Sequence, residues 1–152
     1  MQYFELLHEI KKKKLKRGQD LQPPLPLPRL EKLRAEVEEQ FNQTLPWAYC
    51  ELLSMTNGLT WESLFIYGDV RSTAVGYTER FIPGFLHTNL GLRDIDGMED
   101  FLIFGDDDTL LYTYCVSETE FQTLLKSRMA LVDTYQSFAA MLTFALELNR
   151  GE

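Results

Sequence analysis

With 152 residues, 45% of them hydrophobic and 25% charged, the chain is long enough for one folded domain with a core and too short for two. This composition is that of an ordinary globular protein and excludes a largely disordered chain. The net charge of −8 disfavours nucleic acid as a partner and favours basic proteins. No uncharged apolar run approaches the roughly 18 residues that a membrane-spanning helix needs.

Residues 1–27 predict a helix followed by a stiff connector. Helix is favoured over residues 1–17, and Gly18 can end it. The expected apolar stripe of this helix is Phe4, Leu7, Ile10 and Leu15. The stretch QPPLPLP, Gln22 to Pro28, blocks helix and favours extended polyproline-type backbone. The basic run KKKKLKR, Lys11 to Arg17, is typical of a solvated helix face; the alternative is a contact with nucleic acid or an anionic surface.

Two more helices are expected before the sequence changes character. One begins near Pro28, a residue suited to a first helical turn, and its apolar side is Leu30, Leu33, Val37 and Phe41. The next lies within TLPWAYCELLSMTNG, where Pro46 fits the first turn and Asn57-Gly58 supplies a left-handed stop. We expect Trp47, Cys50 and Leu53 to form its apolar face.

After Gly58 the periodicity changes to short β-rich runs separated by Gly, Asn and Asp. The runs are LFIYG, AVGYTERFI, FLIFG, LLYTYCV, EFQTLL and ALVDTY. A helix from about Ser137 to Asn149 follows. This order predicts an α+β fold, with an antiparallel-rich mixed sheet covered by N-terminal helices and a C-terminal helix, in a single domain over residues 1–152.

The two cysteines, Cys50 and Cys115, each lie within an apolar segment. A secreted disulfide scaffold would be shorter and richer in cysteine. We therefore expect two buried, reduced thiols in a cytosolic protein, with a single disulfide as the alternative.

The acidic residues are unevenly distributed. Between Asp94 and Glu120 there are nine acids and no Lys or Arg: Asp94, Asp96, Glu99, Asp100, Asp106, Asp107, Asp108, Glu118 and Glu120. Clustered carboxylates suit a Mg²⁺ or Ca²⁺ site, an exposed turn, or a surface for a basic partner. The EF-hand pattern fails here, because Gly97 is the fourth residue from Asp94 and Gly105 the twelfth.

Three adjacent aspartates in one tight turn cannot all point at one ion, so Asp106 to Asp108 predict a hairpin tip that also forms part of an acidic contact surface. A metal-dependent hydrolase would instead need Asp94, Asp96 and Asp107 to converge in space. No catalytic motif or metal-ligand spacing is present, and His8 and His87 are far apart. The sequence thus predicts a protein without enzymatic activity or cofactor.

Several segments resemble the SUKH superfamily (Smi/Knr-like), and within it the YrhA-like branch. LPWAYCELLSMTNG is similar to the family's entry helix, with matches at Leu45, Pro46, Tyr49, Leu53, Asn57 and Gly58. LFIYG, FLIFGDD and SFAAML resemble, in order, its first strand, its central strand with the following turn, and the start of its closing helix. The resemblance covers about residues 28–149 and leaves residues 1–27 as an N-terminal addition.

The resemblance implies a binding module without shared catalytic residues. Many bacterial members are immunity proteins that neutralise a toxin domain by binding it, and fungal relatives regulate cell-wall synthesis. We therefore expect an immunity protein that binds a basic toxin domain through the nine acids, with Trp61 as a loop anchor for the interface or else a packed core residue. A regulatory or scaffold protein with a cellular partner is the alternative.

Overall fold

The computed structural model describes residues 2–150 and contains a six-stranded sheet in which every neighbouring pair is antiparallel. The strand order is β1-β2-β5-β6-β7-β8. The strands are β1 (Leu59–Trp61), β2 (Leu64–Ile66), β5 (Phe101–Asp106), β6 (Leu110–Cys115), β7 (Glu120–Leu125) and β8 (Ala130–Tyr135). A separate two-stranded ribbon joins β3 (Ser72–Thr73) to β4 (Phe81–Ile82). The predicted α+β class is confirmed.

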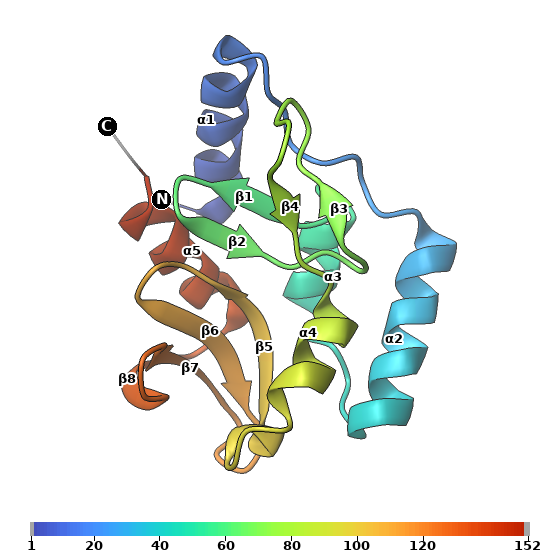
Figure 1. The fold of residues 1–152 in the computed structure, drawn as a ribbon, viewed down its shortest axis with the longest axis vertical. Coiled ribbons are helices and arrows are strands. Elements are labelled where there is room, and N and C mark those ends of the chain that lie inside the picture. The colour runs from blue at the N-terminus through green and yellow to red at the C-terminus, as the bar shows by residue number, and fades with distance from the viewer. Residues whose placement is uncertain (1, 151–152) are drawn as a thin grey trace.

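Five α-helices surround this sheet: α1 (Tyr3–Lys16), α2 (Leu27–Phe41), α3 (Trp47–Leu53), α4 (Phe85–Leu92) and α5 (Phe138–Leu148). Helix α5 packs against α1, α3 and the strands β7 and β8, whereas α4 lies beside β5 and carries α2 on its other side. Figure 1 shows α1 at the upper left, above β1, with α5 below it, and α2 at the far right of the molecule. The N-terminal helix is thus packed onto the C-terminal one.

An aromatic cluster forms the centre of the core. The Tyr49 ring lies 5.0 Å from that of Phe104 and 5.5 Å from those of Phe85 and Phe138, measured between centroids. These residues come from α3, β5, α4 and α5, so one cluster joins three helices to the sheet. The Tyr49 hydroxyl is also buried, and it donates to the Tyr67 carbonyl at 2.7 Å, which satisfies the one polar group in the cluster.

The Asn57-Gly58 pair after α3 has two structural tasks. Gly58 has a φ of +85°, and a Cβ there would overlap the backbone around Gly68, so only glycine fits. Asn57 donates from Nδ2 to the Asp69 carboxylate at 2.8 Å and accepts from the Asp69 amide at 3.0 Å. The pair therefore fixes the loop after β2. At the other end of the chain, Ser137 caps α5 by accepting from the Ala140 amide at 3.1 Å.

Helix α4 was not predicted from the sequence. Much of β5 has no strand on its β2 side, because β2 pairs only with Gly105 and Asp106. The Asn89 side chain fills part of this gap: it donates to the Ile103 carbonyl at 2.8 Å and accepts from the Ile103 amide at 2.7 Å. A buried amide thus replaces a strand partner, and such a role has no local sequence signal.

The stripe predicted for α1 was partly wrong. Phe4 and Leu15 are about half exposed, and the buried residues are Tyr3, Leu6, Leu7, Ile10 and Lys14. Lys14 is 1% exposed, with its ammonium 5.7 Å from the Trp61 ring centroid. Burial, with help from Arg80 and Arg17, lowers the pKa of Lys14 to about 8. Most of the remaining basic run is at least partly exposed, as predicted, and Lys11 pairs with Asp20 at 2.8 Å.

Most of the predicted strands are present in the structure. Five of the six β-rich runs became the strands from β2 to β8 of the main sheet, but AVGYTERFI supplies only the two residues of β4, and β1 was not expected.

Cys50 and Cys115 are both buried and neither forms a disulfide. Among residues 2–150, no helix combines the length and the apolarity needed to cross a bilayer.

Candidate functional site

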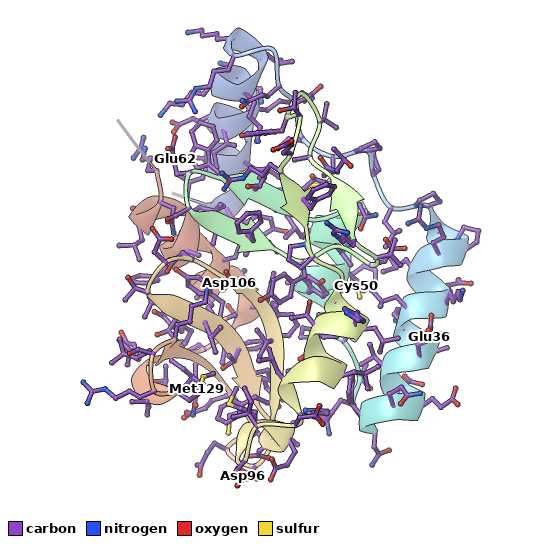
Figure 2. The ribbon with its side chains drawn as sticks, viewed as in Figure 1. Glu36, Cys50, Glu62, Asp96, Asp106 and Met129 are labelled. Atoms are coloured by element: carbon purple, nitrogen blue, oxygen red, sulfur yellow. The ribbon has the colours of Figure 1, made fainter. Side chains whose placement is uncertain are left out.

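The nine acids lie at two opposite ends of the sheet. Because β5 pairs with β6 and β6 with β7 in antiparallel register, the start of β5 lies beside the β6–β7 turn and its end beside the β5–β6 turn. The first group is Asp94, Asp96, Glu99, Asp100, Glu118 and Glu120, which we call the acidic end. The second group is Asp106, Asp107 and Asp108, which we call the β5–β6 turn. Figure 2 shows Asp96 at the bottom of the molecule and Asp106 near its middle, at the other end of β5.

The prediction that Asp106, Asp107 and Asp108 together form an exposed turn is wrong, because only Asp108 is exposed. Asp107 is 4% exposed and accepts four hydrogen bonds. Oδ1 accepts from the amides of Thr109 and Leu110 at 2.9 and 2.8 Å, and Oδ2 accepts from the Tyr112 hydroxyl at 2.6 Å and Asn149 Nδ2 at 3.1 Å. Asp107 thus joins the turn to the end of α5 and cannot contact a partner while the turn is folded.

The pKa of Asp107 is set by its burial and by the same four hydrogen bonds. Burial alone would raise the pKa of Asp107, but the four hydrogen bonds outweigh it and hold the pKa below the ordinary aspartate value. Asp106 is half-buried, accepts from the Tyr67 hydroxyl, and pairs with Lys126 at 3.2 Å. Only Asp108 is exposed. The carboxylates of Asp106 and Asp107 are therefore paired with groups of the protein itself.

At the acidic end, Asp100 connects two segments. Its Oδ1 accepts from the Ser117 amide at 3.1 Å, its Oδ2 from the Ser117 hydroxyl and from Cys115 Sγ at 3.4 Å, and its carbonyl from the Val116 amide at 2.8 Å. The bond from the Ser117 hydroxyl does most to lower the pKa of Asp100. These bonds bring the segment around Asp94–Asp100 against the β6–β7 turn.

The other acids of this end face solvent. Asp94, Asp96, Glu99 and Glu118 are exposed, and Glu120 is half-buried. Within residues 2–150, none of the six is part of an ion pair, whereas Asp106 is. Ile95, 43% exposed, lies among them. The acidic end is therefore a patch of mostly unpaired negative charge around one exposed apolar side chain, and the Arg93 guanidinium, which donates to the Met98 and Phe101 carbonyls, lies close enough to interact with Glu99.

For Trp61 the structure confirms the second of the two predicted roles, a packed core residue, whereas the predicted burial of Trp47 is wrong. Trp61 is 1% exposed, because β1 turns it under α1, and its Nε1 donates to the Arg150 carbonyl at 3.2 Å. It is therefore a core residue and not an interface anchor. Trp47, expected in the apolar face of α3, is 71% exposed, since it is the first residue of that helix. No local sequence pattern separates the two tryptophans.

One pocket is lined by the residue before Trp47 and by the residue after Glu120. The pocket has a volume of about 430 Å³ and is lined by Asn42, Gln43, Thr44, Pro46, Tyr114 and Phe121. Pro46 precedes Trp47, and Phe121 follows Glu120. An exposed tryptophan is the residue type most often found as an anchor in protein interfaces.

In the part of the chain that the structure describes, no three His, Cys, Asp or Glu side chains gather in a way that could hold a metal ion. Asp94 and Asp96 lie at the acidic end and Asp107 at the other end of β5, so the convergence that a hydrolase would need is absent from residues 2–150.

Comparison with known proteins places the fold but not the function. No family model matches the chain, and no curated protein matches it. The crystal structure of a protein from Pseudomonas syringae pv. tomato is similar, with a TM-score of 0.57 over 94% of this chain and 98% of that one. The two chains are 15% identical, so the similarity shows a shared fold alone.

Proposed function

We propose that this chain is a non-catalytic protein-binding module of SUKH type, and that it acts as an immunity protein for a toxin domain. The observation that carries the proposal is the acidic end, where two segments bring six acids together without an ion pair in residues 2–150. Carboxylates left without partners favour association with a basic surface and speed the encounter.

The motifs that resemble the SUKH superfamily support the proposal. Asn57-Gly58 holds the loop after β2, and Ser137 caps α5, so both motifs have tasks that the fold needs. Because these motifs maintain the fold, the surface residues that would contact a partner can differ from one member of the superfamily to another. The exposed Trp47 adds an apolar anchor of the kind found in the centres of interfaces.

The contact surface proposed here is narrower than the nine acids of the sequence prediction. Asp107 and Trp61 are buried and are withdrawn from it, and Asp106 is already paired with Lys126. The acidic end and Trp47 remain. A basic toxin domain would meet the carboxylates with its cations while its apolar surface covers the indole.

The test is a triple charge reversal, Asp94→Lys with Asp96→Lys and Glu99→Lys, because all three side chains are exposed. The probe is the toxin domain encoded next to this chain's gene, and association is measured by surface plasmon resonance at low and high salt. We expect the on-rate at low salt to fall by about tenfold or more, and its salt dependence to shrink.

The matched control reverses three exposed acids elsewhere, Glu31, Glu79 and Glu147, with the same change in net charge. Equal loss in both triple variants would show a general charge effect and remove the acidic end from the proposal. If no toxin gene is adjacent and a resident cellular protein binds through the same acids, the regulatory alternative replaces the immunity function.

A further inference from the structure

A second candidate site is a groove between α2 and α4, beside the loop after β2. Its volume is about 700 Å³, which is within the usual range for small-molecule sites. None of the residues of the acidic end lines it. Figure 1 shows α2 and α4 side by side at the right of the molecule.

The apolar part of the groove is made by Leu33, Val70, Leu86 and Leu90. Leu33 is buried, but Val70 is 56% exposed and Leu90 is 42% exposed. Single exposed apolar side chains are ordinary, whereas two exposed ones beside the half-buried Leu86 and the buried Leu33 on one concave surface indicate a place that an apolar body can cover.

The cationic part is built around Arg29, which is held in a fixed position. Arg29 donates from Nε and Nη2 to the two oxygens of Asp69, at 2.9 and 2.8 Å. Asp69 is 8% exposed, and it also accepts from Asn57 Nδ2 and from the Val70 amide, each at 2.8 Å. The guanidinium is thus anchored to the Asn57 junction, and its Nη1 donates to no group within residues 2–150.

Two further cations line the groove. Lys32 and Arg71 are exposed, and neither is in an ion pair within residues 2–150. Glu36 and Asp69 are the acids of the lining, and Arg29 already neutralises Asp69. The groove therefore has a positive charge in a chain whose net charge is −8.

We propose that this groove binds a small amphipathic carboxylate, such as a medium-chain or aryl carboxylic acid. The carboxylate would accept hydrogen bonds from the guanidinium groups and from Lys32, and planar guanidinium groups suit two-oxygen anions. The apolar body would lie on Val70, Leu86 and Leu90. This site shares no residue with the acidic end, so either proposal can fail without the other.

The test compares two amphiphiles by isothermal titration calorimetry. Decanoate and nonyltrimethylammonium have the same alkyl chain and opposite charges. We expect decanoate to bind with a micromolar to millimolar dissociation constant and the cation not to bind. The double variant Lys32→Glu with Arg71→Glu should weaken decanoate binding by about tenfold or more.

The control is Lys12→Glu with Arg128→Glu, which changes the net charge equally at two exposed positions outside the groove. It should bind decanoate as the unaltered chain does. Replacing Leu90 by Ser should weaken binding through lost apolar contact, with the melting temperature showing that each variant is folded. Equal binding of both amphiphiles, equal loss in the control, or no binding of decanoate at millimolar concentration would overturn the proposal.

Discussion

The two ends of β5 contain the same residue type and use it differently. At the β5–β6 turn, Asp107 takes four hydrogen bonds and Asp106 pairs with Lys126, so the charges are used within the protein. At the acidic end, Asp100 is used in this way and Glu120 accepts one hydrogen bond from Gln122 Nε2, whereas Asp96 and Glu99 face water. A run of acids in a sequence therefore does not define a surface.

The difference follows from what surrounds each turn. The β5–β6 turn lies against the end of α5, where Asn149 and Tyr112 present donors that must be satisfied. The acidic end has a short 3₁₀ segment, Met98–Asp100, and a solvent-exposed turn, so most of its carboxylates meet only water. Mutations should therefore change stability at the first end and association at the second.

The largest effect is expected for Asp107→Ala. The change leaves the buried Leu110 amide and the Tyr112 hydroxyl without their acceptor, which should cost about 3 kcal/mol of unfolding free energy. Urea denaturation would measure it. Asp108→Ala, one residue along and exposed, is the control and should stay within about 0.5 kcal/mol. Similar values for the two variants would contradict the contrast between these neighbours.

Acid should weaken the protein through the same group. Because the folded pKa of Asp107 lies below its ordinary value, the folded state favours the carboxylate. Its contribution is fully present above the unfolded pKa of about 4 and is lost as pH falls through the folded pKa. We expect Asp107→Asn to flatten the loss of stability below about pH 4, measured by urea denaturation across pH, while Asp96→Asn keeps the slope. An unchanged slope in Asp107→Asn would refute the linkage.

The sequence predicted the elements better than the roles of single residues. Helix and strand periodicity is local, so α1, α2, α3, α5 and most strands were placed correctly. Whether a side chain is buried depends on which segments, distant in the sequence, pack against it. Trp61 is covered by α1, and Trp47 is left outside by its position at the start of α3, and no local pattern distinguishes them.

The candidate site was predictable only in part for the same reason. The uneven distribution of acids was visible in the sequence, but its division between two ends depends on the antiparallel register of β5 and β6. The groove between α2 and α4 was not visible, because α4 was not predicted and Arg29, Val70 and Leu90 are separated along the chain. Pairings of this kind require the tertiary structure.

Asp100→Ala is expected to have an intermediate effect. It removes the acceptor for the Ser117 amide and hydroxyl at a half-buried position, so a loss of about 1 kcal/mol is expected by urea denaturation. Association with the proposed toxin domain should slow as well, because the two acidic segments lose their connection. Glu99→Ala is the control: it should leave stability within about 0.5 kcal/mol. A more stable Asp100→Ala would refute the connecting role.

The smallest effect on stability is expected for Lys126→Ala, and this variant tests the boundary between the two ends. Lys126 is 45% exposed and pairs with Asp106, so its loss should cost about 0.5 kcal/mol, and less at high salt. The change leaves Asp106 without its ion pair and makes the β5–β6 turn more acidic. The control is Arg128→Ala, which removes one positive charge at another exposed position. If only the acidic end contacts the proposed toxin domain, the on-rate for that domain should change equally little in Lys126→Ala and in the control. A clearly larger rise for Lys126→Ala would mean that both ends contribute, since the partner would then be responding to the charge of the turn.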